Sequence, residues 1–176
     1  QNKNLKKFIH ISTDEVYGDM DDISKDVTAD EQFPLVASSY YSATKASSDM
    51  LVLSAHRTFD LPYIITRTCN NYGAHQHKEK FIPTIMRSIK EGKKIPVYGD
   101  GKQVREWMDV TDNTLVIYNL MMSDRINEVF NIGSEERYTN LEVIEMIGKI
   151  MGRTSEYEFV PDRLGHDRRY ALNSSK

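Results

Sequence analysis

Hydrophobic and polar positions along the first 70 residues predict a strand, a helix and a second strand. Residues 8–11 are a short apolar run with two isoleucines, typical of a buried strand. Residues 38–59 begin with serines suited to an N-cap and continue with apolar residues at three- and four-residue spacing, which predicts one long helix. Those recurring positions are Ala43, Ala46, Met50 and Leu53. A second apolar run, residues 63–66, completes a strand–helix–strand order that indicates a parallel α/β sheet.

The rest of the chain also alternates between predicted helices and strands, which are shorter. Residues 19–37 are acidic, polar and without a period, so we expect a surface loop there. Helices are predicted over about 80–91, ended by Gly92, and over about 111–122 and 140–151. Strands are predicted near 95–98, 103–108, 128–133 and 155–160. The fold class is therefore α/β, with a small α/β lobe in the second half.

Composition and charge narrow the classes of protein. The chain has 176 residues, of which 39% are hydrophobic and 28% charged, enough for one well-buried core. A net charge of −3 gives no reason to expect a nucleic-acid or membrane-surface partner. No apolar run approaches the roughly 18 residues of a membrane span, so we expect a cytoplasmic protein. Because the chain opens with Gln1 close to a predicted buried strand, we expect it to be a piece of a longer protein.

The single cysteine, Cys69, excludes an intramolecular disulfide framework and any multi-cysteine zinc site. It lies beside Asn70 with no evident base partner, so we interpret it as a small buried residue. No metal site is predicted.

A run of four polar residues, 12–15, directly follows the first predicted strand. Asp14 and Glu15 are adjacent carboxylates. Placed beside an apolar strand, they destabilise the fold unless they are solvated, cap a helix or take part in catalysis. Taken alone, a capping or turn role is the simpler interpretation of the pair.

Tyr41 and Lys45 lie four residues apart on the long predicted helix and so share a face. Lowering a tyrosine pKa from about 10 to ~7 requires roughly 4 kcal/mol of differential stabilisation. One lysine together with a cofactor cation could supply it and make Tyr41 a general base at neutral pH. The alternative is a tyrosine on the core side of the helix, with its lysine extending past it to solvent.

The two groups are expected to meet. Ligands of open α/β sheets bind beyond the carboxyl ends of the strands, where the first strand ends and the long helix begins. Thr13, Asp14 and Glu15 would then share one crevice with Tyr41 and Lys45. Two carboxyl groups beside an activated phenol form a site that can abstract one proton and donate another.

Six segments together resemble the dTDP-glucose 4,6-dehydratases, NAD-using enzymes of the extended short-chain dehydrogenase/reductase superfamily. They are STDEVYGD, YYSATKASSD, CNNYGAHQHKEKFIP, IPVYGDGKQVREW, VFNIGS and DRLGHDRRY. The resemblance spans nearly the whole chain but only the later part of such an enzyme. It implies that residues 1–70 are the later part of a Rossmann-like NAD-binding domain. Residues 71–176 would mainly form a nucleotide-sugar-binding lobe, with some segments returning to the Rossmann sheet, and the protein would be a homodimer.

The resemblance also implies roles in catalysis. Tyr41 would remove the proton of the sugar 4-hydroxyl, and Lys45 would lower the pKa of Tyr41 and contact the nicotinamide ribose. Thr13 would hydrogen-bond the same sugar hydroxyl. Glu15 would abstract the C5 proton, and protonated Asp14 would help the 6-hydroxyl to leave as water. The implied reaction oxidises C4 with NAD, loses water across C5–C6 and returns hydride to C6, giving dTDP-4-keto-6-deoxyglucose.

Binding residues follow from the same resemblance. Asn70 is expected to contact the sugar nucleotide and Asn71 the cofactor, although both would also suit a turn before Gly73. Arg105 is implied as a diphosphate clamp, whereas taken alone it would be a solvated surface cation. The other expected nucleotide-sugar contacts are Lys80, Phe81, Pro96, Val97, Tyr98, Asn140, Asp162, Arg163, Leu164, Gly165 and His166.

The sequence departs from the family pattern in three ways. Tyr40 and Leu164 stand where the family usually has proline, and neither change removes a functional group. The Gly-rich fingerprint that seats a pyrophosphate on a helix N-terminus is absent from these 176 residues. We therefore expect the complete protein to be an enzyme and the 176 residues alone to be inactive.

Three other functions remain open. The sequence distinguishes poorly between a 4,6-dehydratase acting on dTDP-glucose and one acting on UDP- or CDP-glucose. A nucleotide-sugar 4-epimerase or decarboxylase would share Tyr41 and Lys45, but such enzymes eliminate no water and do not need Asp14 and Glu15 there. A non-catalytic nucleotide-sugar-binding module would not need these side chains at all.

Overall fold

The computed structural model describes residues 4–21, 24 and 26–176. The helices are the 3-10 turn η1 (Asp14–Tyr17) and the α-helices α1 (Tyr40–Phe59), α2 (Phe81–Glu91), α3 (Val110–Met122) and α4 (Asn140–Ile150). The strands are β1 (Phe8–Thr13), β2 (Tyr63–Thr68), β3 (Asn70–Tyr72), β4 (Ile95–Tyr98), β5 (Val104–Asp109), β6 (Glu128–Ile132), β7 (Arg137–Thr139) and β8 (Tyr157–Val160).

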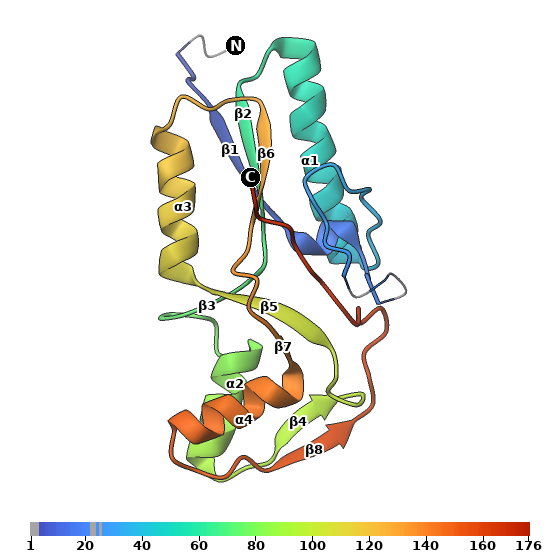
Figure 1. The fold of residues 1–176 in the computed structure, drawn as a ribbon, viewed down its shortest axis with the longest axis vertical. Coiled ribbons are helices and arrows are strands. Elements are labelled where there is room, and N and C mark those ends of the chain that lie inside the picture. The colour runs from blue at the N-terminus through green and yellow to red at the C-terminus, as the bar shows by residue number, and fades with distance from the viewer. Residues whose placement is uncertain (1–3, 22–23, 25) are drawn as a thin grey trace.

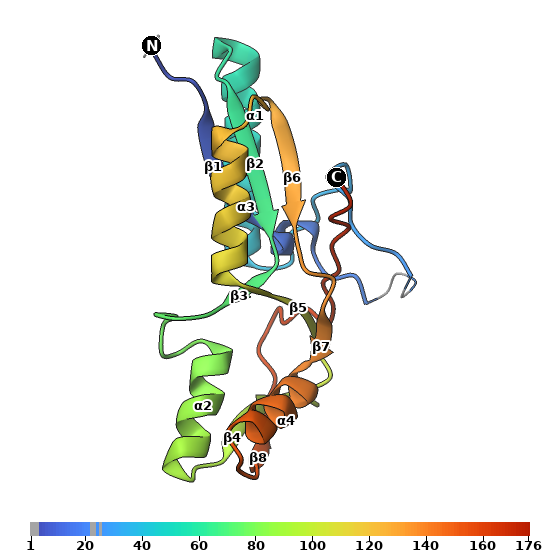
Figure 2. The same cartoon turned by 60° about the vertical axis from the view of Figure 1, so that its left-hand side comes forward.

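A parallel sheet of order β1-β2-β6 lies between two helices. Phe8 pairs with Tyr63 at the start of β1 and β2, and β2 continues the ladder to β6. Helices α1 and α3 lie on opposite sides of this sheet (Figures 1 and 2). All six residues of β2 are buried, as expected for the central strand of a parallel sheet covered on both faces. The predicted α/β fold with a parallel sheet is confirmed.

Helices α2 and α4 with strands β4 and β8 form a smaller lobe at the other end of the molecule, while α3 and β6 return to the central sheet (Figure 1). Strands β4 and β8 pair in parallel, and α2 and α4 pack together beside them. Between the lobe and the central sheet, β5 pairs in parallel with β3 and antiparallel with β7. Strands β3 and β7 are three residues each and were not predicted, because three residues carry no measurable period.

Helix α1 is confirmed, but its buried face differs from the apolar spacing. Ser39 is the N-cap, and its side chain accepts a hydrogen bond from the backbone N–H of Ser42 in a capping box. The fully buried residues are Ser42, Asp49 and Val52, whereas Met50 of the predicted stripe is 57% exposed. The buried side of the helix therefore mixes the polar Ser42 and Asp49 with the apolar Val52.

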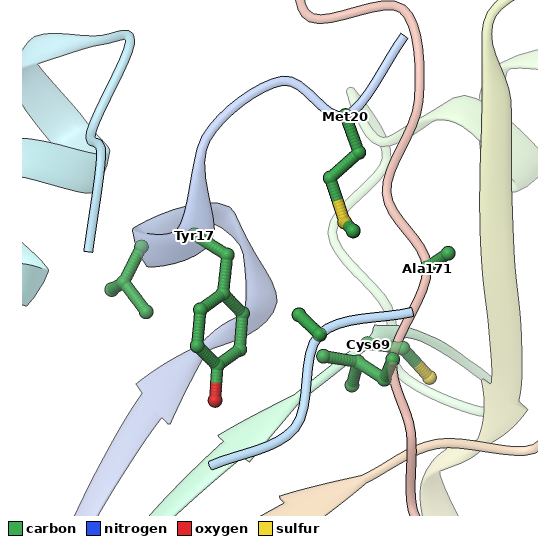
Figure 3. Packing of buried hydrophobic residues seen from close by; sticks show 7 residues of the cluster. Tyr17, Met20, Cys69 and Ala171 are labelled. Atoms are coloured by element: carbon green, nitrogen blue, oxygen red, sulfur yellow. The ribbon is translucent and has the colours of Figure 1, made fainter. Parts of the chain in front are cut away.

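One hydrophobic cluster joins segments that are far apart in the sequence. Figure 3 shows Tyr17, Met20, Cys69 and Ala171 of this cluster, from η1, the loop after it, the end of β2 and the C-terminal segment. Cys69 is 3% exposed, which confirms the prediction that it is a small buried residue. The loop at 19–37 is thus packed onto the core at Met20 rather than lying wholly on the surface.

The segment 162–173, called here the C-terminal strap, runs from the lobe back toward the central sheet (Figure 1). Leu172 forms an isolated parallel bridge with Ala29. The guanidinium of Arg169 donates to the carbonyls of Met20 and Val27, at 3.2 and 2.9 Å. The strap therefore fixes the loop that follows η1.

Candidate active site at the carboxyl end of β1

The carboxylate turn, η1, begins where β1 ends. The Thr13 hydroxyl accepts a hydrogen bond from the Glu15 N–H at 3.3 Å and donates to Asp14 Oδ1 at 3.2 Å. Gly18 closes the turn at φ 76°, and a Cβ there would lie 1.9 Å from the Val36 carbonyl oxygen. The sequence therefore needs glycine at this position, because both the left-handed backbone and the close approach exclude a side chain.

Asp14 is 2% exposed. Its Oδ2 has no hydrogen-bond partner among the residues that the structure describes. Burial, followed by the charge of Glu15, raises the pKa of Asp14 to about 7, although the Thr13 hydroxyl and Arg105 oppose the rise. A carboxyl group with this pKa is substantially protonated near neutral pH and can act as an acid.

Glu15 lies in a different environment, half-buried at the mouth of the turn. Burial raises its pKa and Asp167 contributes, but Arg105 and Lys80 oppose the rise. The two adjacent carboxyl groups therefore differ in their tendency to hold a proton. The deeply buried Asp14 favours its protonated form, whereas Glu15 faces several cations. Such a pair can supply one acid and one base.

Tyr41 and Lys45 both lie on α1 near this turn. Burial and the charges of Glu15 and Asp14 raise the pKa of Tyr41, opposed by a hydrogen bond with the Thr13 side chain. The Lys45 ammonium donates to the Ile11 carbonyl at 2.5 Å. In this chain alone the pKa of Tyr41 is thus raised, first by burial and then by the two carboxylates, whereas the expected lowering involved a cofactor cation as well as the lysine.

Tyr41 is 53% exposed, so the alternative of a core-facing tyrosine does not hold. Its phenol instead interacts with the Thr13 hydroxyl, which also contacts Asp14. The structure thus brings the polar run after β1 and the start of α1 to one place.

The two predicted asparagines form β3 beside β5, where Asn70 pairs with Trp107. The Asn71 amide donates to the Thr68 hydroxyl at 3.1 Å and to the Cys69 carbonyl at 3.0 Å. Its Oδ1 is buried and has no hydrogen-bond partner among the described residues. Asn71 therefore keeps an acceptor available at the carboxyl end of β2, and the pair is part of a strand rather than of a turn.

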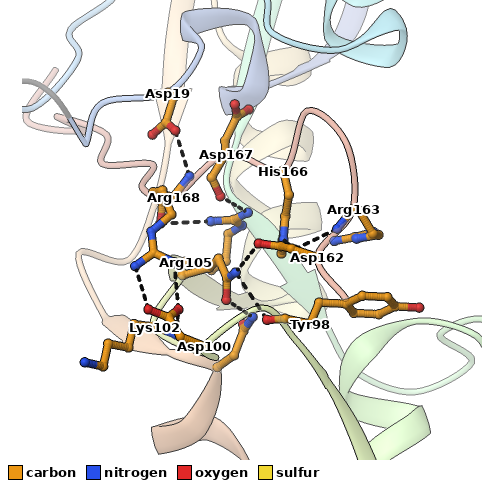
Figure 4. Close-up of polar contacts among 12 residues, drawn as sticks. Asp19, Tyr98, Asp100, Lys102, Arg105, Asp162, Arg163, His166, Asp167 and Arg168 are labelled. Atoms are coloured by element: carbon orange, nitrogen blue, oxygen red, sulfur yellow. Dashed lines mark hydrogen bonds and ion pairs between the residues drawn. The ribbon is translucent and has the colours of Figure 1, made fainter. Parts of the chain in front are cut away.

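Arg105 is buried, which contradicts the alternative of a solvated surface cation (Figure 4). Its guanidinium donates to the carbonyl of Asp167 at 2.7 Å and to that of Val104 at 2.9 Å. The cation lies 4.4 Å from the centre of the Tyr170 ring. Arg105 thus supports the strap while its charge acts on the carboxylate turn.

The first residues of the strap pack on the end of β4 (Figure 4). Asp162 accepts from Gln103 at 3.1 Å, and its other oxygen lies 2.6 Å from His166 Nδ1. The Arg163 guanidinium lies 5.0 Å from the centre of the Tyr98 ring. An aromatic ring and a cation are thereby held side by side on the surface.

The other predicted binding residues have mixed positions. Val97 is 1% exposed inside the lobe core, so its side chain is not available to a ligand, whereas Leu164 is fully exposed. Phe81 stacks on Trp107 with 6.2 Å between ring centres. Asn140 begins α4 and its amide donates to the Gln103 side chain at 3.3 Å. Of the remaining positions, Lys80 is exposed just before α2 and Pro96 is half-buried in β4. Gly165 is exposed and has a backbone φ of 66°.

Sequence reasoning missed a clasp between the strap and the start of α1. The Ser38 hydroxyl donates to Asp167 Oδ2 at 2.5 Å, and the Tyr170 hydroxyl donates to the same oxygen. Asp167 is 5% exposed. The only available signal was the run of serines before the helix, which was interpreted as capping alone.

No group of three or more His, Cys, Asp or Glu side chains within the described ranges could hold a metal ion. In the same part of the chain, no helix combines the length and apolar character needed to cross a membrane.

Comparison with known proteins gives consistent matches. Residues 1–133 match the NAD dependent epimerase/dehydratase family. The chain is 47% identical over 173 residues to the low-salt glycan biosynthesis protein Agl12 of Haloferax volcanii, covering 98% of this chain and 54% of that protein. It is 45% identical over 186 residues to a dTDP-glucose 4,6-dehydratase of Haemophilus influenzae, covering 99% of this chain and 54% of the relative.

A solved structure of the dTDP-glucose 4,6-dehydratase of Bacillus anthracis in complex with NAD superimposes with a TM-score of 0.89. That enzyme is 45% identical, and the match covers 96% of this chain and 53% of the other. The chain thus spans about half the length of the relatives it matches.

Proposed function

The chain belongs to the NAD dependent epimerase/dehydratase family, and we propose that the whole protein converts dTDP-glucose to dTDP-4-keto-6-deoxyglucose. The observation that carries this proposal is the carboxylate turn. Burial makes Asp14 a carboxyl group with a pKa of about 7, next to Glu15, which faces cations. Removal of water from a sugar needs one group to take a carbon-bound proton and another to protonate the departing oxygen.

The residues of this chain also fit NAD. The buried Oδ1 of Asn71, which has no partner in the described part of the chain, lies at the carboxyl end of β2, and the ammonium of Lys45 lies at that of β1. This is the edge where such sheets bind dinucleotides. When bound, NAD supplies the oxidant that takes hydride from the sugar and returns it. Because burial and then the carboxylates raise the pKa of Tyr41, a positive charge additional to Lys45 is required before the phenol acts as a base.

Each side chain then has a defined part. Tyr41 takes the proton of the 4-hydroxyl, and Thr13, which contacts both Tyr41 and Asp14, orients that hydroxyl. The resulting 4-ketone acidifies the proton on C5, which Glu15 removes. Asp14 protonates the 6-hydroxyl, which leaves as water.

The lobe and strap offer the surface for the nucleotide diphosphate. Tyr98 presents a ring, and Arg163 and Lys80 present cations beside the carboxylate turn. Arg105 contributes its charge from beneath the strap. These groups suit an aromatic base and an anionic diphosphate.

The test uses the whole protein with NAD and dTDP-glucose in D₂O, followed by the mass of the product. Loss of one water with one deuterium gained is the expected result. A new sugar isomer of unchanged mass would identify an epimerase and overturn the proposal. Conversion of UDP- or CDP-glucose in preference to dTDP-glucose would correct the nucleotide alone.

Substitution of the acid sharpens the test. We expect Asp14→Asn to slow water loss more than C4 oxidation, because only the first step needs its proton. Asp112→Asn, an exposed carboxylate in the first turn of α3, is the matched control and should leave both rates unchanged. Equal slowing of both steps by Asp14→Asn would remove the acid role.

We also propose that the whole protein is a homodimer that uses the outer face of α1. This face exposes Met50 at 57% and Leu51 at 70%, beside a groove that Leu35 and Ala46 also line. Light scattering on the whole protein and on a Leu51→Glu variant tests it. We expect the variant to be monomeric; a wild-type monomer would refute the proposal.

A further inference from the structure

A buried polar network connects the two elements that carry the proposed catalytic groups. Arg67, in the central strand β2, donates from Nε to Asp49 of α1 at 2.9 Å. The same guanidinium donates from Nη1 to the Tyr17 hydroxyl at 2.9 Å. Tyr17 in turn donates to the Asn131 side chain of β6 at 2.7 Å. These four residues are called here the Arg67 network.

The network is enclosed in the protein. Asp49 is 0% exposed, Tyr17 2%, Arg67 3% and Asn131 7%. His10 Nε2 lies 3.1 Å from the second oxygen of Asp49, and burial lowers the pKa of His10. With His10 neutral, one carboxylate and one guanidinium balance each other. Loss of either partner would leave a buried charge unpaired and without water. The pair therefore keeps its geometry firmly.

The two ends of the Arg67 network lie on η1 and α1, the two elements that carry the proposed catalytic residues. Tyr17 is the last residue of η1, three positions after Asp14, and 3-10 geometry places such residues on one side of the turn. Asp49 is one helical turn after Lys45 and two turns after Tyr41, on the same face of α1. Figure 3 shows the Tyr17 ring extending from the turn toward the strands of the central sheet.

From this arrangement we infer that Arg67 and Tyr17 are positioning residues that set the distance between the carboxylate turn and the Tyr41–Lys45 face of α1. The inference rests on the proposed function. The two steps act on neighbouring carbons of one bound sugar, so Tyr41 on α1 and Glu15 on η1 must both be in place for the same pose. Reacting groups need placement within about 0.5 Å, which neither a lone strand end nor a lone helix provides.

The network predicts an asymmetry between its two arms. Removal of the Tyr17 hydroxyl releases the carboxylate turn, while Arg67 still holds α1 through Asp49. Arg67 also keeps its hydrogen bond from Nη1 to the Glu31 carbonyl, at 3.2 Å. The elimination step should therefore suffer and the oxidation step should not.

The test is Tyr17→Phe in the whole protein, which retains the ring and its edge contact with Phe33. A substrate carrying deuterium at C4 reports the hydride transfers, including oxidation, and one carrying deuterium at C5 reports elimination. We expect elimination to slow by about 10- to 100-fold, the usual effect of a small misplacement, and oxidation to change less than about 2-fold. The C5 isotope effect should rise and the C4 isotope effect should fall.

Ile144→Val, in the lobe core at 1% exposure, is the control for lost stability. It should leave both isotope effects unchanged. Asn131→Ser is the second arm. It withdraws the acceptor of the Tyr17 hydroxyl, together with the amide's hydrogen bonds to the Ala29 and Asn173 carbonyls, and should shift the isotope effects in the same direction as Tyr17→Phe. This variant decides the question if Tyr17→Phe does not fold.

Two outcomes overturn the inference. Equal slowing of both steps with unchanged isotope effects would mean that the network supports stability alone, and so would a loss of stability with unaltered rates. Failure of the wild-type protein to dehydrate dTDP-glucose is a different result, because it refutes the proposed function and the inference falls with it.

Discussion

Replacement of Asp14 by asparagine should stabilise the protein at alkaline pH even as it impairs the proposed reaction. The carboxyl group is 2% exposed and its Oδ2 has no partner among the described residues. Asparagine keeps the hydrogen bond that Asp14 Oδ1 accepts from Thr13 and carries no charge. The variant therefore resembles protonated Asp14 at every pH.

The magnitude follows from the pKa. A solvated aspartate titrates at 3.8 and buried Asp14 at about 7, so at roughly 1.4 kcal/mol per pKa unit ionisation destabilises the fold by about 4 kcal/mol. Below pH 3.8 both states are protonated and the penalty is absent. Between the two pKa values the folded state binds more protons, so stability falls as pH rises. Above about pH 7 the penalty is constant.

The assay is urea unfolding of the whole wild-type and Asp14→Asn proteins at about pH 4, 6 and 8. We expect the free energy of unfolding of the variant to exceed that of wild type by up to about 4 kcal/mol at the highest pH and to converge with it at the lowest. A difference that does not depend on pH would refute the reasoning.

Asp100 provides a control of opposite sign. Its hydrogen bonds with Arg168 lower its pKa to about 2. Because the folded pKa is depressed, its contribution to stability is present above the unfolded value and lost as pH falls through about 2. Asp100→Asn should therefore destabilise slightly at neutral pH and not in strong acid.

Three further outcomes are expected. Glu15→Gln removes a charge that raises the pKa of Tyr41, so the phenolate band near 295 nm should appear at lower pH than in wild type; an unchanged titration contradicts the coupling. Gly18→Ala should destabilise by roughly 1–2 kcal/mol from the left-handed backbone alone, and more because its Cβ meets the Val36 carbonyl, as measured by thermal unfolding. Ser38→Ala removes one anchor of the strap and should raise KM for the sugar nucleotide more than it lowers kcat; the reverse pattern in steady-state kinetics would argue against the anchor.

Sequence periodicity predicted the bounds of the longer elements well, but it predicted poorly which of their residues face the core. Helix α2 ends at Gly92 in the left-handed conformation, as its glycine indicated. Helix α1 was correct in extent, but its sheet-facing side carries Asp49, and Met50 points outward. Apolar spacing cannot reveal a buried carboxylate whose partner, Arg67, comes from a strand eighteen residues later.

The closeness of the carboxylate turn to the start of α1 was predictable, and the electrostatics of this place less so. The position of Asp14 and Glu15 after a buried strand, with Tyr41 at the start of the next helix, followed from the parallel order of the sheet. The raised pKa of Tyr41 did not, because it follows from burial and from the charges of Glu15 and Asp14. Nor did the burial of Arg105, because it depends on the strap. That segment has no regular structure around residues 162–168, so no period marks it.

The connection of the strap to the start of the chain has a consequence for how the protein folds. The Asp19 carboxylate accepts hydrogen bonds from the backbone N–H groups of Arg168 and Arg169, 149 and 150 positions away. Closing loops of this length is entropically slow, so such contacts form late in folding. On the ribosome, β1, α1 and β2 emerge and can pair long before the strap is synthesised. The hydrogen bonds that join Asp19 to the strap are therefore acquired late, after the central strands and helix α1 have paired.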